Sequence, residues 1–268
     1  MKPSRSLGQV FLRDKTYVKR ILSSLDFKGK VICEIGSGRG EVSQYLVRNA
    51  KFLYCVELDL RFCELLQKQF GHLKNVKIIH QDILKLPLSS LPEKLIVFGN
   101  VPYQISNHLI RYLVHNRARI ERAYLTLQKE FAQKLIAKAA RPNYGFLSCY
   151  AQYYARITKL FDIPRQAFMP RPKVNSSFIA IEFYPQPIHR AVRPELLFEI
   201  IRKAFLQRRK KIINSLPFLK GKDDLLDALN ISPAARAQEL PLKTYVDLAN
   251  RLTQGAYRLT NNSCSCEK

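Results

Sequence analysis

The sequence predicts an α/β fold: an open sheet with covering helices, followed by a small all-helical domain. Short apolar runs typical of buried strands alternate with amphipathic helical segments through most of the chain. Several of these runs end in glycine, a carboxylate or an amide, as strands that present a ligand site do. After Pro185-Gln186-Pro187 the pattern turns all-helical. We therefore predict two domains, residues 1–186 and 187–268.

Composition narrows the class of partner. The 268 residues are 47% hydrophobic, which is enough for a sizeable core. The net charge of +24, from 45 Lys and Arg against 21 Asp and Glu, favours a polyanion, nucleic acid first and an anionic membrane surface second. No apolar run approaches the ~20 residues of a spanning helix, and the first residues lack the apolar core of a secretion signal. We expect a cytoplasmic protein.

The six cysteines do not suggest a disulfide framework in a chain this long. Cys33 and Cys55 lie in predicted buried strands, and Cys63 and Cys149 lie in helical stretches, so we interpret all four as small core hydrophobes. Cys264-Ser265-Cys266 has one intervening residue and no second ligand pair nearby. We expect a polar tail there and predict no metal site.

Along the chain, the first predicted helix covers residues 16–25, where apolar residues follow helical spacing. The segment before this helix, Ser6-Leu7-Gly8-Gln9-Val10-Phe11-Leu12, is called the arm below. It could close over a ligand or simply anchor this part of the chain. The first predicted strand, residues 31–35, runs into Gly36-Ser37-Gly38-Arg39-Gly40, and glycines let a backbone approach a ligand closely. Glu41 departs from the dinucleotide fingerprint, which favours a nucleoside with an amino-acid tail over a pyrophosphate cofactor. A plain strand-to-helix turn is the alternative.

The next two strands also end in carboxylates. Residues 52–56 lead into Glu57, about 20 residues past the glycines, where a carboxylate can accept from both ribose hydroxyls of a nucleoside. We predict that Asp59 caps the helix over residues 60–70. Residues 76–80 lead into Asp82, whose carboxylate can accept from an exocyclic amine on the base of that nucleoside. Seen alone, Asp82 fits an N-cap or loop role better.

Gly99-Asn100-Val101-Pro102-Tyr103 follows the apolar run 95–98. Proline removes a donor and holds the residue before it extended, so backbone carbonyls point out of the sheet. The Asn100 side-chain oxygen and the Val101 carbonyl can accept the two hydrogens of an exocyclic amine on a purine, while Tyr103 stacks on the ring. The alternative is a strand-ending turn whose tyrosine merely packs.

These residues resemble a known class of enzyme. Asn-x-Pro-Tyr resembles the fourth motif of S-adenosylmethionine-dependent adenine methyltransferases, and the order of the motifs resembles the class I, Rossmann-like methyltransferases. The opening heptad resembles the Gly-Gln-Asn-Phe-Leu signature of the ribosomal RNA adenine dimethyltransferases, with Val10 replacing the family's asparagine or histidine. The resemblance implies S-adenosylmethionine as cofactor, bound by Gln9, Val10, Leu12, Gly36, Gly38, Glu57, Asp82 and Asn100.

A loop in the second half extends the resemblance. We predict helices over 105–114, 131–139 and 144–154, a strand over 123–127, and a hairpin from 156–162 to 177–183. The intervening Phe168-Met169-Pro170-Arg171-Pro172-Lys173-Val174 resembles the family's Phe-x-Pro-x-Pro-Lys-Val segment, whose aromatic forms the second wall of the target-base pocket. Phe168 opposite Tyr103 would then sandwich a flipped adenine. A rigid turn with Phe168 in the core is the alternative.

The helical tail contains Arg208-Arg209-Lys210-Lys211 after a predicted helix over 196–206. In so basic a chain we favour phosphate contacts over a solvated face. Two later segments, 236–240 and 245–250, complete a domain that resembles the C-terminal domain of the small-subunit dimethyltransferases.

Over residues 6–252 the resemblance implies dimethylation of two adjacent adenines near the 3′ end of small-subunit ribosomal RNA, with catalytic residues Asn100, Pro102, Tyr103 and Phe168. It also implies a role in small-subunit biogenesis, a pre-ribosomal particle as substrate, and a monomer without a DNA or membrane partner. Two alternatives stay open. One is modification of large-subunit RNA, which the tail after Pro187 disfavours. The other is a non-catalytic assembly factor. Val10 favours this alternative, and the intact segment 99–103 after the apolar run 95–98, called the corner below, disfavours it.

Overall fold

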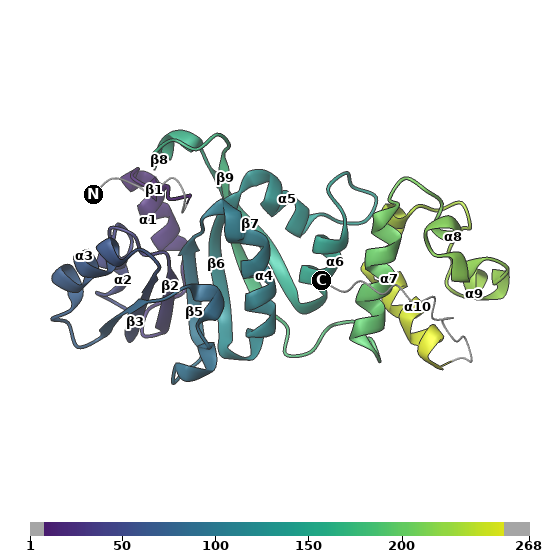
Figure 1. Cartoon of the computed structure of the whole chain (residues 1–268), viewed down its shortest axis with the longest axis horizontal. Helices are drawn as coiled ribbons and strands as arrows, with labels where there is room; N and C mark the ends of the chain where they lie inside the picture. The colour runs from purple at the N-terminus through teal and green to yellow at the C-terminus, as the bar shows by residue number, and fades with distance from the viewer. Residues whose placement is uncertain (1–7, 255–268) are drawn as a thin grey trace. The chain divides into compact units, whose positions relative to one another are not determined.

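The computed structural model describes residues 8–254, which divide into two compact units (Figure 1). The first unit holds the chain up to Ile136 together with Tyr154–Pro185, and the second holds Ala137–Tyr153 and the chain from Gln186 onward. The division after Pro185 lies one residue from the predicted boundary. Residues 137–153, which we had assigned to the first domain, instead belong to the second unit. Cys264 and Cys266 lie outside the described residues.

The first unit is built on a seven-stranded sheet in the order β4-β3-β2-β5-β6-β9-β7. Strands β2 to β6 are parallel where they pair, and β9 runs antiparallel to both β6 and β7. The predicted α/β class and the predicted hairpin are therefore confirmed. The strand bounds are β2 Val31–Ile35, β3 Phe52–Glu57, β4 Val76–His80, β5 Leu95–Asn100, β6 Ile120–Gln128, β7 Ala155–Ile163 and β9 Ser176–Phe183.

The helices of this unit lie close to the predicted ranges. The predicted helix over 60–70 is confirmed in full, with Asp59 capping it through the Arg61 amide. The helix after the glycine turn is a single turn that ends at Leu46, with Val47 as its C-cap. The helices are α1 Lys15–Ser24, α2 Ser43–Leu46, α3 Leu60–Phe70, α4 Ser106–His115 and α5 Lys129–Ile136. Short 3-10 turns cover Ile83–Lys85, Leu88–Ser90, Tyr103–Ile105, Arg117–Arg119 and Arg165–Ala167.

Side-chain alternation along the strands places polar residues and core residues on the same face of the sheet. Ile32, Phe98 and Phe178 lie on one face of the sheet and pack against Val18 and Ile21 of α1 in a single hydrophobic cluster. Since successive strand residues alternate between faces, the same face carries Glu34, Glu57 and Asn100 at the carboxyl ends of β2, β3 and β5. These polar side chains therefore border the core at one edge of the sheet.

The arm forms a pairing that the sequence did not predict. β1, Phe11–Leu12, pairs antiparallel with β8, Phe168–Met169, so that Leu12 lies opposite Phe168. The Phe168 side chain is 4% exposed and belongs to the hydrophobic cluster. The expected exposed partner of Tyr103 in a base sandwich is thus not observed, and the core alternative describes Phe168, because an apolar ring gains free energy by burial.

The second unit is helical. Its elements are α6 Phe146–Tyr154, whose last residue belongs to the first unit, then α7 Pro194–Leu206, α8 Ile212–Ser215, α9 Asp223–Ala228 and α10 Leu242–Gln254, with 3-10 turns at Pro217–Leu219 and Ala237–Glu239. Tyr144 contacts Phe205 and Tyr153 contacts Phe198, with ring centroids 5.8 Å and 5.4 Å apart. These aromatic contacts to α7 explain why residues 137–153 belong to this unit. No helix within residues 8–254 is long and apolar enough to cross a membrane.

The basic run lies in the turn between α7 and α8. Arg208 Nε donates to Gln238 Oε1 at 2.6 Å, and its guanidinium also donates to the Pro142 carbonyl. Arg209, Lys210 and Lys211 are exposed. Arg208 therefore braces the turn, whereas its three neighbours face solvent.

Cys33, Cys55, Cys63 and Cys149 are free and buried, as we predicted for core hydrophobes. No cluster of three or more metal-binding side chains occurs in the described part of the chain.

Candidate functional site

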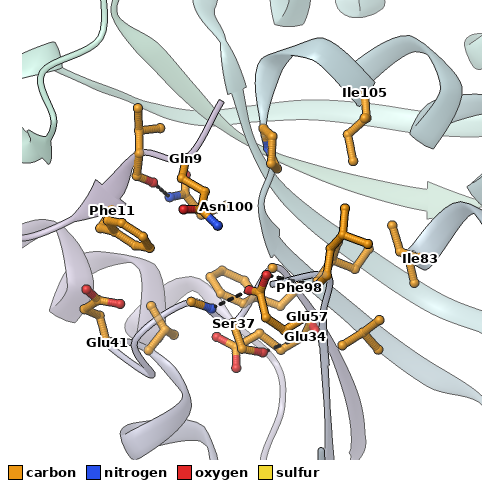
Figure 2. Close-up of a pocket in the computed structure, with 18 of the residues that line it drawn as sticks. Gln9, Phe11, Glu34, Ser37, Glu41, Glu57, Ile83, Phe98, Asn100 and Ile105 are labelled. Carbon is orange, nitrogen blue, oxygen red and sulfur yellow. Dashed lines mark hydrogen bonds between the residues drawn. The ribbon is translucent and has the colours of Figure 1, made fainter. Parts of the chain in front are cut away.

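A cavity opens at the carboxyl ends of β2 and β5 (Figure 2). The chain passes from β2 outward to β3 and β4 and then returns to β5 on the other side of β2. Ligands of open α/β sheets bind at such a reversal of strand order. Every residue that the resemblance assigned to the cofactor lines this cavity, namely Gln9, Val10, Leu12, Gly36, Gly38, Glu57, Asp82 and Asn100.

The glycine turn lies against both the arm and β3. Gly38 has φ +55°, and a Cβ atom there would come within 2.8 Å of the Phe11 ring, so only glycine permits this approach. The Gly38 amide donates to Glu57 Oε2 at 2.8 Å. The Arg39 guanidinium lies over the Phe11 ring, with its carbon 4.7 Å from the ring centroid. The turn thus holds the arm over the cavity.

Glu57 is held in one orientation. Besides the bond from Gly38, its Oε1 accepts from the amides of Leu58 and Asp59 at 2.9 Å each. A carboxylate offers about four acceptor positions, so about one remains for a ligand hydroxyl. The side chain is only 6% exposed, and Figure 2 shows it on the cavity floor beside Glu34. A preorganised acceptor of this kind suits a ribose.

Asp59 ties the arm to α3. Its carboxylate accepts from the Arg61 backbone amide and from the Arg61 guanidinium, at 2.7 Å for the shorter ion-pair contact. The Gln9 amide donates to Asp59 Oδ2 at 3.1 Å. The Arg61 side chain lowers the pKa of Asp59 to about 2, so this acceptor stays ionised near neutral pH. Gln9 therefore anchors the arm through a carboxylate that the sequence assigned only to helix capping.

Asp82 and Leu58 also line the cavity. Asp82 Oδ1 accepts from the Leu84 amide at 3.0 Å, which confirms the N-cap role left open above, while its contact with an adenine amine stays a prediction. The Leu58 side chain lines the cavity and is 49% exposed, and Ile83 lies nearby on the wall. Sequence analysis missed both apolar residues, although an apolar Leu58 between two strand-end carboxylates was a usable signal.

Asn100 connects the arm to the corner after β5. Its Nδ2 donates to the Val10 carbonyl oxygen at 2.9 Å, the contact drawn at the top of Figure 2. Because a carbonyl only accepts, the amide nitrogen faces the arm and Oδ1 is the remaining acceptor. Pro102 also lines the cavity and precedes the turn Tyr103–Ile105. The catalytic role of these residues stays a prediction.

Tyr103 and Phe168 do not line this cavity. The Tyr103 hydroxyl shares a hydrogen bond with Ser176 Oγ at 2.8 Å, and burial raises the pKa of the phenol. Tyr103 is half-buried as a residue, and contact of its ring with a base stays a prediction. Sequence analysis missed Ser176, whose link to Tyr103 crosses 73 residues of chain.

Glu34 was also missed. It lies within the apolar strand β2, is 3% exposed, and accepts a hydrogen bond from Ser43 Oγ. Burial raises its pKa to about 7. An acidic residue inside an otherwise apolar strand was the signal that could have identified it.

The charge of the lining selects the kind of ligand. Four carboxylic acids, Glu34, Glu41, Glu57 and Asp82, border the cavity, and no lysine, arginine or histidine does so within the described chain. Such a lining repels a pyrophosphate and suits a ligand with hydroxyl groups and a positive charge. The residues therefore fit S-adenosylmethionine, which carries a ribose and, with a sulfonium, an ammonium and one carboxylate, a net positive charge.

Comparison with solved structures shows the fold. A dimethyladenosine transferase from Plasmodium falciparum superposes with a TM-score of 0.78 at 22% identity, covering 91% of this chain and 98% of that one. The 23S rRNA methyltransferase ErmE gives a TM-score of 0.73 at 23% identity, covering 91% and 100%. At these identities the likeness shows the fold, that of an α/β methyltransferase.

Sequence comparison gives the family. The family model "Ribosomal RNA adenine dimethylase" matches residues 1–254, and the chain belongs to that family. A protein from Pseudomonas aeruginosa named "Ribosomal RNA small subunit methyltransferase A" is 36% identical over 254 residues, 93% of this chain and 94% of that protein. A namesake from Mesomycoplasma hyopneumoniae is 34% identical over 251 residues, 92% and 95%. The chain is an adenine methyltransferase that uses S-adenosylmethionine, as predicted.

Proposed function

We propose that the protein dimethylates the exocyclic amines of two adjacent adenosines near the 3′ end of small-subunit ribosomal RNA. The substrate in this proposal is a pre-ribosomal particle in the cytoplasm, and the enzyme acts as a monomer during small-subunit biogenesis. The names of relatives 34% and 36% identical support the choice of subunit. The observation that carries the chemistry is Asn100, whose Nδ2 is engaged by the arm so that Oδ1 is left as the acceptor.

Asn100 and Val101 act on the target amine. When bound, S-adenosylmethionine would supply the methyl group by breaking its sulfonium carbon–sulfur bond, and the neutral thioether S-adenosylhomocysteine would be the leaving group. In the first transfer, Asn100 Oδ1 and the Val101 carbonyl accept the two amine hydrogens, which draws the nitrogen towards tetrahedral geometry and frees its lone pair for attack. In the second transfer, the monomethylated amine has one hydrogen left to donate to these acceptors. Positioning the reactants accounts for much of the rate, since well-oriented reactions gain ~7–11 kcal/mol. After transfer the amine carries an extra proton, which it loses to water.

Tyr103 supplies the stacking surface for the target adenine in this proposal. Base stacking on an aromatic ring is worth ~1–3 kcal/mol. We assign Phe168 a supporting role, because its ring is buried against Leu12 and the core. The corner therefore holds the base by one ring and two acceptors.

Exposed cations of the second unit extend the substrate contact. Arg209, Lys210 and Lys211 face solvent in the turn after α7, where phosphates can reach them. Arg208 keeps the turn in shape through Gln238. Such contacts bind the phosphates of the RNA backbone and do not depend on base sequence. In this proposal the structure of the pre-ribosomal particle therefore determines which adenosines reach the site.

The test is primer extension across ribosomal RNA after incubation with the purified enzyme. Immature small subunits lacking the modification should acquire two adjacent stops, because dimethyladenine blocks Watson–Crick pairing. The Asn100→Ala variant should produce these stops ~10²–10³ times more slowly. Stops in large-subunit RNA alone would instead support the large-subunit alternative. Small subunits that bind the enzyme and stay unmethylated would support the non-catalytic assembly factor.

A further inference from the structure

The hydrogen bond between Tyr103 and Ser176 spans three neighbouring strands, β5, β6 and β9. Tyr103 follows the carboxyl end of β5, and Ser176 is the first residue of β9. Between them lies β6, whose last residue Gln128 pairs with Ser176. Because β9 is antiparallel, its beginning lies at the same sheet edge as the end of β5. The Tyr103 side chain therefore extends across the end of β6.

Both ends of the Tyr103 ring are fixed. The backbone holds one end in the turn Tyr103–Ile105, and the hydroxyl at the other end meets Ser176 Oγ at 2.8 Å. Ser176 is itself 0% exposed and held between β6 and β7. A ring with both ends held cannot swing about its side-chain torsions, so the entropy of ordering it is lost on folding and not on binding the base.

The sheet places Ser176 on the face that carries the site. Ser176 and Phe178 alternate with Ser177 along β9, and Phe178 belongs to the cluster with Phe98. Asn100 follows Phe98 by the same alternation. Ser177 points to the opposite face, where its hydroxyl donates to Asp162 Oδ1 at 2.7 Å. Ser176 and Ser177 are both fully buried but have different partners. Only Ser176 contacts Tyr103, the residue proposed to stack on the target base.

We propose that Ser176 is a positioning residue that holds the Tyr103 ring as a preformed wall for the target adenine. The proposal rests on the proposed function, because the ring is taken to stack on the methylated base. Ser176 does not touch the base or the cofactor in this scheme. It acts by fixing the plane of Tyr103 before the base arrives.

The experiment is a double-mutant cycle on single-turnover methyl transfer to immature small subunits with saturating cofactor. Ser176→Ala and Tyr103→Phe each break the same hydrogen bond, so each should slow transfer about fivefold, the value of one ordinary hydrogen bond. The double variant should also be about fivefold slower, since the second change removes nothing further. Ser177→Ala, the matched control, should stay within about twofold of wild type.

Cofactor affinity and thermal melting are measured on the same variants. Unchanged calorimetric affinity for S-adenosylmethionine would place the defect on the base side. Should Ser176→Ala fail to fold, Tyr103→Phe breaks the bond without altering β9. A Tyr103→Phe rate equal to wild type, or a double variant about 25-fold slower, would overturn the positioning role while leaving the proposed function standing. A wild-type enzyme that transfers no methyl group would overturn both.

Discussion

Asn100 Nδ2 donates to the backbone carbonyl of Val10 at 2.9 Å, joining two positions 90 residues apart. The residue expected to polarise the target amine is therefore also the residue that receives the arm over the cofactor cavity. The contact uses the backbone of residue 10, so the replacement of the family's polar side chain by Val10 does not remove it. Val10 is therefore no longer an argument that the protein is a non-catalytic assembly factor.

The first prediction is that Asn100→Ala slows single-turnover methyl transfer by ~10²–10³, because one preorganised acceptor is lost from the transition state. It should also weaken S-adenosylmethionine binding by ~1 kcal/mol, since the arm loses one hydrogen bond. Rapid-quench transfer and calorimetry measure the two effects. Transfer at the wild-type rate would leave the corner as a strand end without a catalytic role.

The second prediction concerns the arm. From the sequence alone, Val10→Asn would tighten cofactor binding if a side-chain hydrogen bond at that position ordered the arm. In the structure the Val10 side chain packs against the hydrophobic cluster and its carbonyl makes the contact, so we now expect no gain. Gln9→Ala should instead weaken binding by ~1 kcal/mol, because the bond to Asp59 is lost. Calorimetry on both variants decides, and a tighter Val10→Asn would contradict the backbone contact.

The third prediction concerns Glu57. Glu57→Ala should weaken S-adenosylmethionine binding by ~1–3 kcal/mol, because a ribose hydroxyl and the Gly38 amide both lose an acceptor. Glu57→Gln is the matched control, since its single carbonyl oxygen replaces only part of the three amide contacts. It should bind with intermediate affinity. Equal affinity of all three proteins would exclude Glu57 from the cofactor site.

The fourth prediction is a pH dependence of stability. Burial raises the pKa of Glu34 from 4.5 to about 7, so between these values the folded state keeps a proton that the unfolded state has lost. The free energy of unfolding should then fall as pH rises through this window, by up to about 1.4 kcal/mol per pH unit, and level off above it. Glu34→Gln cannot titrate and should flatten the curve. Denaturant titrations from pH 4 to pH 8 compare the two proteins, and parallel curves would refute the assignment.

The fifth prediction separates the cations of the turn after α7. Arg209→Ala and Lys210→Ala should each weaken binding to immature subunits and reduce the salt slope by about one, because each removes one phosphate contact. Arg208→Ala should mainly lower the melting temperature, since it breaks the contacts with Gln238 and Pro142. Filter binding at several salt concentrations, with thermal melting alongside, distinguishes the roles. A salt slope unchanged in Arg209→Ala would make the turn a solvated surface.

The sequence by itself determined the sheet and the chemistry at its edge. Runs such as 31–35 and 76–80 are read correctly because strand and helix periods are local, and the polar residues that end them must then meet at one edge of a parallel sheet. That reasoning placed Gly36, Gly38, Glu57, Asp82 and Asn100 at this edge, whereas Gln9, Val10 and Leu12 came from the family resemblance; all eight line the cavity. It also gave the helix cap at Asp59, which depends on neighbours two residues away.

Only the tertiary structure decided how these parts engage one another. The decisive contacts join segments 73 to 158 residues apart. They are the pairing of β1 with β8, which includes Met169 opposite Phe11, the bond from Asn100 to Val10 and the bond from Tyr103 to Ser176. No local period specifies such contacts, because they depend on which apolar faces bury each other when the chain collapses. The division of the chain shows the same limit: the aromatic face of α6 packs on α7, and this long-range packing assigns residues 137–153 to the helical unit.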